Sequence, residues 1–320
     1  MTAGAFHVLL SGRFEARERG DWLRALRAAG PEFGWLSDDD GEIARETIDA
    51  AVVANPAPAA LRGMPRLRLV QSLWAGVDRL LADATLPPDV PLARMVEPML
   101  SAAMAETALW ATLSLQRGFF DYAVQQRAGV WQQMEQRRAE DMRVLVLGLG
   151  QMGCAVASRL AAQGFAVSGW RLSLGAASTP CAVSAYAGNG ALAGLLATSD
   201  IVLNLLPLTA ATSGLLDARF FAGMRRSASL VNLARGAHVV DDDLLAALDA
   251  GHLRHAVLDV FQVEPLPAEH RYWRHPRVTL LPHVAALTDM RSAAHVVAAN
   301  LRAVRDGTAL AHRVDRTRGY

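Results

Sequence analysis

The sequence predicts a two-domain α/β protein in which parallel strands alternate with helices. Its 320 residues correspond to roughly two domains at about 150 residues per domain. Short apolar runs that end in turn residues alternate with helical patterns through most of the chain, which is typical of β-α-β units around a parallel sheet. Because 52% of the residues are hydrophobic, the chain can fill two cores.

The amino-acid composition excludes several classes of function. All 32 basic residues are arginine, so the chain has no lysine for a Schiff base, a P-loop or a kinase site. The formal net charge of +1 gives no long-range field that would attract nucleic acid or an acidic membrane. We therefore expect neither nucleic acid nor a membrane among the partners.

Cysteine usage and the first residues indicate an intracellular protein. The two cysteines, Cys154 and Cys181, cannot form a disulfide framework or a cysteine-rich metal site, so no metal is expected. The first residues lack the basic region of a signal peptide, and no apolar stretch approaches the ~18 residues of a membrane span. We expect a cytoplasmic location.

The first hundred residues contain one small α/β unit. Strands are predicted at three apolar runs, 6–10, 50–54 and 67–71. A helix is expected at 21–30, where Asp21 can cap its start and Gly30 can end it. A continuous helical pattern at 102–126 then predicts a helix that connects two domains.

A second, longer series of apolar runs follows this helix. Strands are predicted at 143–147, 166–170, 201–205, 229–232, 256–259 and 278–281. A last amphipathic helix is expected at 288–305, before a polar tail.

A glycine-rich loop joins the first strand of this series to a helix. In the pattern G-x-G-x-x-G, Gly148 permits the tight turn, Gly150 lets a pyrophosphate approach the backbone, and Gly153 lets the helix pack close to the strand. The helix N-terminus offers N–H groups to the phosphates. The pattern predicts a Rossmann dinucleotide-binding domain. Cofactor contacts are expected from Gly148, Leu149, Gly150, Gln151, Met152 and Gly153.

The end of the next predicted strand indicates which dinucleotide binds. The position where an acidic residue usually binds the ribose 2′-hydroxyl is held by Arg171, next to Trp170. A carboxylate would repel a 2′-phosphate, whereas a guanidinium can pair with it and Ser173 can add a hydrogen bond. The sequence therefore favours NADP(H), with NAD(H) as the second choice. The alternative is that Arg171 only points into solvent.

Further motifs follow the glycine loop along the chain. They are, in sequence order, Ser199 to Thr209, Asn232 to Gly236, Asp243 to His252, Leu258 to Pro265 and Leu281 to Ala285. Together they resemble the D-isomer-specific 2-hydroxyacid dehydrogenase family over nearly all of residues 143–290. The loop at 73–78 and the closing segment Val314 to Tyr320 are similar to the glyoxylate/hydroxypyruvate reductase A branch, which reduces short 2-oxo acids with a preference for NADPH.

This resemblance implies that one domain binds the substrate and the other binds the dinucleotide. A smaller, flavodoxin-like substrate-binding (catalytic) domain is expected at 1–101 and 288–320, and the dinucleotide-binding domain at 102–287. The resemblance also implies a homodimer built around the nucleotide-binding domains, with 102–131 contributing.

Three side chains fit the reduction of a 2-oxo acid. Arg235 follows a predicted strand, and its planar fork suits a carboxylate beside a carbonyl. His283 can give a proton to the carbonyl oxygen as hydride reaches the carbon. A carboxylate within about 4 Å would hold that proton on the ring, which is the role expected of Glu264 and the role that the family resemblance implies. As alternatives, Arg235 can form a surface salt bridge, and Glu264 and His283 can be ordinary loop residues.

The remaining expected contacts rest on the resemblance. It implies that Asp259 accepts a hydrogen bond from the nicotinamide carboxamide, that Pro207 contacts the cofactor, and that the backbone of Trp74, Ala75 and Gly76 binds the substrate carboxylate. Asp259 can instead cap the next turn, and Trp74 can be an ordinary core residue.

The expected reaction is NADPH-dependent reduction of glyoxylate to glycolate and of hydroxypyruvate to D-glycerate. Two other functions stay open. One is another reaction of the fold, such as phosphite oxidation or reduction of a different 2-oxo acid, although Glu264 disfavours the formate branch, which has Gln there. The other is a non-catalytic protein that senses NAD(P).

Overall fold

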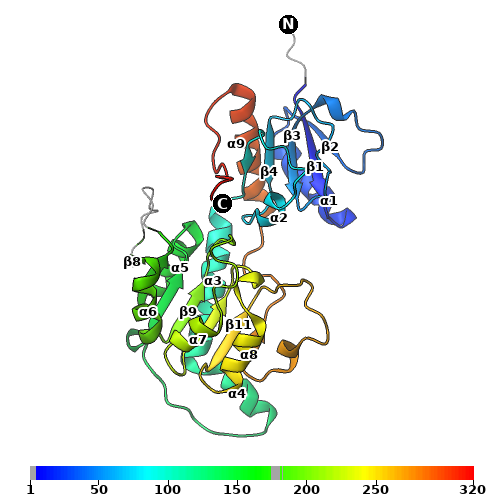
Figure 1. Ribbon diagram of the computed structural model, residues 1–320. Helices are drawn as coiled ribbons and strands as arrows, with labels where there is room; N and C mark the ends of the chain where they lie inside the picture. The colour runs from blue at the N-terminus through cyan, green and yellow to red at the C-terminus, as the bar shows by residue number, and fades with distance from the viewer. Residues whose placement is uncertain (1–4, 174–180, 182) are drawn as a thin grey trace. The chain divides into compact units, whose positions relative to one another are not determined.

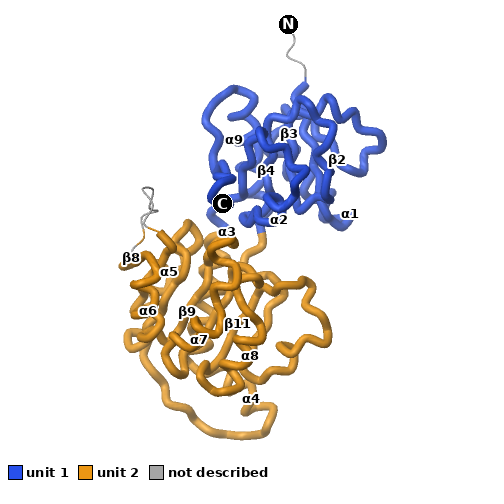
Figure 2. Tube along the Cα trace, viewed as in Figure 1, with its two compact units in different colours: residues 1–100, 288–320 blue, residues 101–287 orange. Residues whose placement is uncertain are grey.

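The computed structural model describes residues 5–173, 181 and 183–320 (Figure 1). The chain divides into two compact units, which are shown in different colours in Figure 2. Unit 1 comprises residues 1–100 and 288–320, and unit 2 comprises residues 101–287. None of the helices in the described ranges is long and apolar enough to cross a membrane.

The described residues of unit 1 form a five-stranded parallel sheet with the order β2-β1-β3-β4-β5. The strands are β1 (His7–Gly12), β2 (Gly34–Ser37), β3 (Ile48–Ala54), β4 (Leu69–Ser72) and β5 (Leu92–Ala93). This is the flavodoxin-like strand order. All seven residues of β3 are buried, as expected for a central strand that is covered on both faces.

Helices from both ends of the chain cover one face of this sheet. Helix α1 (Ala16–Ala29) packs beside α9 (Met290–Asp306), although they are separated by most of the sequence (Figure 1). Trp22, Leu26 and Ala29 form the buried side of α1, at the spacing of one helix face. The short helix α2 (Asp78–Leu81) follows β4.

The predicted start of α1 is wrong, whereas its predicted end is confirmed. The helix begins at Ala16, so Asp21 lies inside it and pairs with Arg24 in the next turn. Strong helix formers upstream of Asp21 extend the helix toward the N-terminus. Gly30 ends it, and its N–H donates to the Leu26 carbonyl at 2.9 Å.

Unit 2 contains, in its described residues, a seven-stranded parallel sheet with the order β12-β11-β10-β9-β6-β7-β8. The strands are β6 (Arg143–Leu147), β7 (Ala166–Arg171), β8 (Ser184–Ala187), β9 (Ile201–Asn204), β10 (Ser229–Asn232), β11 (His255–Leu258) and β12 (Val278–Leu280). Starting from β6, the first six strands have the Rossmann order. The two-domain α/β fold class is therefore confirmed.

Helices cover both faces of the unit 2 sheet. Helices α3 (Pro98–Arg117) and α5 (Gln151–Ala162) contribute to the core on one face. Helices α6 (Gly188–Thr198), α7 (Ala218–Gly223) and α8 (Asp241–Asp249) contribute to the core on the other. Short 3-10 helices lie at Arg45–Thr47, Ala139–Asp141, Gly236–His238 and Arg271–Arg274.

The uninterrupted helix predicted at 102–126 is wrong. The structure has two helices there, α3 and α4 (Phe119–Arg127). Gly118 separates them with a φ of 68°, a left-handed conformation that glycine adopts without steric cost. The strands β2, β5 and β8 were not predicted, because they are short and have few apolar residues to mark them.

Candidate active site

The glycine loop lies at the carboxyl end of β6, next to the point where the strand order reverses. Gly148 has a φ of 95°, and a Cβ atom there would lie 2.6 Å from the Leu205 carbonyl oxygen. A Cβ atom on Gly153 would lie 1.7 Å from the Gly148 carbonyl oxygen, so α5 can approach β6 only through a glycine. Gly150 faces open space, with no atom within 4 Å of its Cβ position. The loop therefore leaves room where a pyrophosphate would lie.

The other loop residues divide into buried and exposed ones. Leu149 packs in the core, Met152 is partly buried, and Gln151 is exposed at the start of α5. Pro207 is exposed beyond the end of the neighbouring strand β9, and its carbonyl oxygen accepts a hydrogen bond from the Thr212 hydroxyl at 2.7 Å. Gln151 and Pro207 thus lie at the carboxyl edge of the sheet, where a dinucleotide binds in this fold.

The end of β7 lies beside the same loop, because the Gly148 N–H donates to the Trp170 carbonyl at 2.8 Å. Trp170 itself is fully buried, and its indole donates to the Gly188 carbonyl at 2.9 Å. Its side chain is part of the core, which leaves only its backbone to reach a cofactor. Arg171 has a buried Nε atom with no hydrogen-bond partner among the residues that the structure describes. Such a donor fits an anionic ligand, and Ser173 is exposed close by in the sequence.

Three adjacent strands, β10, β11 and β12, bring the expected catalytic residues to one edge of the sheet. Arg235 follows β10 and is half-buried, and its Nη1 donates to the Ala234 carbonyl at 2.8 Å. A Cβ atom on Gly236 would lie 1.9 Å from the Phe261 carbonyl carbon. The close packing at Gly236 is therefore with the loop that follows β11.

Glu264 and His283 lie within hydrogen-bond distance of each other. Nδ1 of His283 is 2.8 Å from Oε2 of Glu264, and the other carboxylate oxygen accepts the Phe261 N–H at 2.9 Å. The His283 side chain is 50% exposed and that of Glu264 is 22% exposed. The carboxylate fixes one side of the ring, so that Nε2 is the atom suited to exchange a proton with a ligand.

Asp259 holds the loop that carries His283. Its carboxylate accepts hydrogen bonds from the N–H groups of Val284 and Ala285 at 2.7 and 3.0 Å, and its carbonyl oxygen accepts the His283 N–H at 2.8 Å. Burial raises the pKa of the Asp259 carboxyl, and these two hydrogen bonds to the carboxylate act in the opposite direction. The side chain thus binds the backbone of the loop after β12, about 25 residues further along the sequence, and the hydrogen bonds that fix it are not those of a cap on the turn directly after β11.

A buried polar network behind Arg235 was missed by the sequence analysis. The Asn204 amide donates to Asn232 Oδ1 at 3.0 Å and lies 3.1 Å from His238 Nδ1. The Asn232 amide in turn donates to the Arg235 carbonyl at 3.0 Å. All three network side chains are fully buried, so they fix the backbone on which Arg235 stands. The only sequence signal was an Asn at the end of two apolar runs.

In unit 1, the loop Trp74 to Gly76 follows β4. Trp74 packs partly against the core beneath α1 and α9, and its carbonyl oxygen accepts the Met95 N–H at 3.0 Å. Within the described ranges, no acceptor is hydrogen-bonded to the N–H of Ala75 or Gly76. These two donors are therefore available for a ligand.

The comparison with known families decides what this arrangement is. The family described as D-isomer specific 2-hydroxyacid dehydrogenase, NAD binding domain, matches residues 109–285. A crystal structure of a D-isomer specific 2-hydroxyacid dehydrogenase from Xanthobacter autotrophicus Py2 is 38% identical and covers 99% of this chain and 100% of its own, with a TM-score of 0.91. The chain belongs to the D-isomer specific 2-hydroxyacid dehydrogenase family.

Two other members of this dehydrogenase family are similar over the same length. The NADPH-dependent glyoxylate/hydroxypyruvate reductase of Sinorhizobium meliloti is 34% identical, covers 98% of this chain and 100% of its own, and has a TM-score of 0.90. A probable 2-hydroxyacid dehydrogenase of Rhizobium etli CFN 42 is 30% identical, covers 99% and 100%, and has a TM-score of 0.89.

These relatives carry nicotinamide cofactors in their crystals. The Xanthobacter structure contains NADPH, and the Sinorhizobium and Rhizobium structures contain NADP. The protein is an oxidoreductase of this family, and the matched residues 109–285, which lie in unit 2, are its NAD-binding domain.

Proposed function

We propose that this dehydrogenase reduces short 2-oxo acids with NADPH, converting glyoxylate to glycolate and hydroxypyruvate to D-glycerate. The observation that carries the proposal is the Glu264–His283 pair, with 2.8 Å between carboxylate and ring, at the same sheet edge as Arg235. The similarity to the Sinorhizobium reductase, at 34% identity, supports this substrate class.

Each residue has a distinct task in the proposed reaction. NADPH, when bound, supplies the hydride that reaches the carbonyl carbon. Arg235 and the N–H groups of Ala75 and Gly76 bind the carboxylate of the acid. His283 gives its Nε2 proton to the carbonyl oxygen, while Glu264 orients the ring and stabilises its positive charge. Asp259 supports the His283 loop, and its contact with the nicotinamide carboxamide stays a prediction.

An assay of NADPH oxidation with a panel of 2-oxo acids tests this function. We expect turnover with glyoxylate and hydroxypyruvate, and a loss of about 10²-fold or more in kcat for His283→Ala, because the proton donor is removed. NADPH binding should stay within about twofold of the wild-type affinity, since the ring lies outside the cofactor contacts assigned here.

The control is His295→Ala, which removes an exposed histidine on α9 and should leave kcat unchanged. Turnover of phosphite in place of a 2-oxo acid would move the assignment to another reaction of the fold. NADPH binding without turnover of any substrate would favour a sensing protein.

The cofactor preference is assigned to Arg171. Its buried Nε atom has no hydrogen-bond partner among the described residues, which supports pairing with a 2′-phosphate. We expect Arg171→Asp to raise the KM for NADPH by about 10-fold or more and to leave that for NADH within about threefold, as measured by steady-state kinetics with both cofactors. Equal changes for the two cofactors would contradict this assignment.

We also propose a homodimer formed by the face around α4 and the segment after it. Several large apolar side chains are exposed there, including Phe119 at 54%, Val130 at 47% and Trp131 at 98%. Exposed apolar side chains gathered in one stretch are typical of protein interfaces. Light scattering of the wild type and of Trp131→Ser measures the dimer directly, and a monomeric wild type would contradict the proposal.

A further inference from the structure

Arg94 lies directly after the edge strand β5 of the unit 1 sheet. This strand pairs with β4 in the parallel sheet, and the loop Trp74 to Gly76 follows β4. The hydrogen bond from the Met95 N–H to the Trp74 carbonyl, at 3.0 Å, ties the two segments together. Arg94 therefore lies at the carboxyl edge of the sheet, beside the loop to which the carboxylate of the substrate is assigned.

The neighbours of Arg94 show which face of the sheet it shares. Ala93 and Met95 are fully buried in the core beneath α1 and α9, whereas Leu92 belongs to the core on the opposite face. Side chains alternate along an extended segment, so Arg94 lies on the face of Leu92. Val77, which follows the substrate loop, packs into that same opposite core.

A second basic residue, His312, lies next to Arg94. The Arg94 N–H donates to the His312 carbonyl at 3.1 Å, and the antiparallel bridge between Ala93 and Arg313 aligns the C-terminal tail with β5. Ala93 and Arg313 lie directly opposite each other, so the next pair in this antiparallel register is Arg94 and His312, and their side chains lie on the same face. His312 has a φ of 57°, which is unusual for a residue with a side chain.

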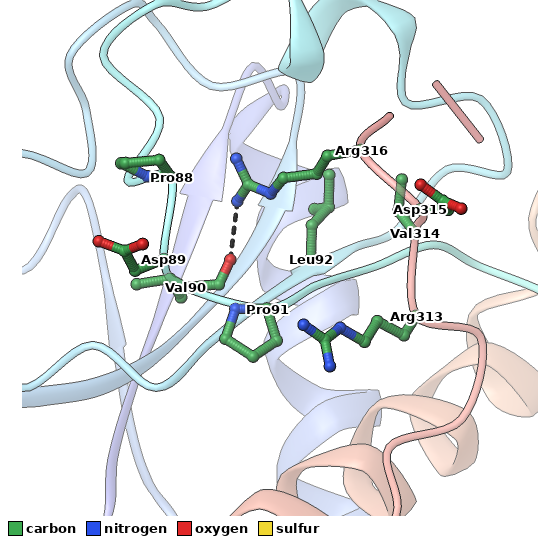
Figure 3. Close-up of a pocket in the computed structure, with 9 residues that line it drawn as sticks. All are labelled: Pro88, Asp89, Val90, Pro91, Leu92, Arg313, Val314, Asp315 and Arg316. Atoms are coloured by element: carbon green, nitrogen blue, oxygen red, sulfur yellow. Dashed lines mark hydrogen bonds between the residues drawn. The ribbon is translucent and has the colours of Figure 1, made fainter. Parts of the chain in front are cut away.

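The tail that carries His312 is anchored firmly. The Val314 N–H donates to the Leu92 carbonyl at 2.8 Å, and the Val314 side chain is buried. The Arg316 guanidinium donates to the Val90 carbonyl at 2.7 Å (Figure 3). It also donates to the Pro87 carbonyl at 2.9 Å. His312 is thus held beside Arg94 by contacts on both sides of the tail.

Among the described residues, neither basic side chain has an acidic partner. Across the part of the chain that the structure describes, no ion pair or side-chain hydrogen bond involves Arg94 or His312. Other arginines of unit 1 are paired, such as Arg66 with Asp49 at 2.7 Å. Both Arg94 and His312 are half-buried, and a buried cation without a counter-charge is costly unless a ligand supplies one.

The protonation of the two groups agrees with this arrangement. Burial lowers the pKa of the Arg94 guanidinium. Burial lowers the pKa of His312 as well, and the positive charge of Arg94 lowers it further. The pair therefore presents one cation and one neutral imidazole, which together favour a ligand that accepts hydrogen bonds.

We propose that Arg94 and His312 bind an oxygen-bearing group attached to C3 of the 2-oxo acid, either a hydroxyl or a carboxylate, and so determine which acids are preferred. This inference rests on the proposed function, because it assigns the substrate carboxylate to the neighbouring loop. The C3 group is a hydrogen-bond acceptor, either the hydroxyl of hydroxypyruvate or the second carboxylate of a short dicarboxylic 2-oxo acid. Glyoxylate has no C3, and pyruvate carries only a methyl group there.

The test compares kcat/KM of the wild type and of Arg94→Gln with glyoxylate, pyruvate, hydroxypyruvate and oxaloacetate. We expect Arg94→Gln to lower kcat/KM by about tenfold or more for an acid with an oxygen-bearing group on C3 and by less than about threefold for glyoxylate and pyruvate. A selective loss with hydroxypyruvate identifies the hydroxyl as the ligand, and one confined to oxaloacetate identifies the carboxylate. Equal losses with all four acids, or no loss, would overturn the proposal.

Two further variants serve as a replacement and as a control for Arg94→Gln. Asparagine tolerates the positive φ of His312, so His312→Asn should also lower kcat/KM for the acids with an oxygen-bearing group on C3. It replaces Arg94→Gln in the test if that variant does not fold. Arg316→Gln weakens the tail without touching the pair and should affect all four acids alike. If the wild type reduces no 2-oxo acid, the proposed function itself fails. If it reduces them but the variants do not discriminate, only the C3 assignment fails.

Discussion

Asp259 shows how a single buried carboxylate positions the proposed proton donor. Its two oxygens accept the N–H groups of Val284 and Ala285, the two residues after His283. An asparagine can accept with only one atom, and its NH2 group would face the second backbone donor. We expect Asp259→Asn to lower the free energy of unfolding by about 1–3 kcal/mol, because one buried N–H loses its partner. Urea unfolding measures this loss, and kcat should fall with it as the His283 loop moves.

The matched control for this variant is Asp306→Asn. Asp306 is exposed at the end of α9 and pairs with the adjacent Arg305, so its replacement should change stability by less than about 0.5 kcal/mol. An Asp259→Asn protein that unfolds at the same urea concentration as the wild type would show that the loop does not depend on these hydrogen bonds.

At the scale of elements, the strand–loop–helix unit of β6 and α5 separates packing from ligand binding. A Cβ atom on Gly153 would lie 1.7 Å from a backbone oxygen, whereas one on Gly150 would meet no atom within 4 Å. We expect Gly153→Ala to destabilise unit 2 by about 1–3 kcal/mol or more, because α5 must move away from β6. Thermal unfolding measures this change.

Gly150→Ala is the complementary variant in the same loop. Its unfolding free energy should stay within about 1 kcal/mol of the wild-type value, since the added methyl group has room. NADPH affinity should nevertheless fall by about tenfold or more, because the methyl group occupies the space left for the pyrophosphate. Unchanged affinity in a fluorescence titration would remove the pyrophosphate from this position.

At the scale of the whole molecule, the sequence predicted those features of the fold that depend on local patterns, and it missed those that depend on long-range contacts. Long apolar runs and the glycine spacing predicted the central strands of both sheets and the α/β class. The break at Gly118 was missed because the helical pattern continues on both sides of it, and the break depends on the positive φ of this single residue. The Asn204–Asn232 contact joins residues 28 positions apart in the sequence, so it depends on which strands become neighbours.

The same long-range packing makes the stability of unit 2 depend on pH through His255. This side chain on β11 is 6% exposed, and its ring stacks on Phe120 with centroids 4.7 Å apart. Its Nε2 lies 2.9 Å from the Thr279 hydroxyl. Burial lowers the pKa of His255 to about 4. The unfolded chain, with an ordinary histidine pKa of about 6.5, therefore binds a proton in a pH range where the folded protein does not.

The stabilisation from neutral His255 is complete above pH ~6.5 and is lost as the pH falls toward ~4, by about 3 kcal/mol in total. We expect His255→Gln to remove this slope, since glutamine stays neutral and can still bond to Thr279. Asp200 acts in a lower range: burial tends to raise its pKa, but hydrogen bonds from Arg137 and the Arg143 N–H outweigh burial and keep its pKa low. Its contribution is lost only below pH ~4. Urea unfolding of the wild type and of His255→Gln between pH 7 and 4 measures the difference in the pH dependence of the unfolding free energy. Parallel curves for the two proteins would show that His255 titrates normally in the folded state.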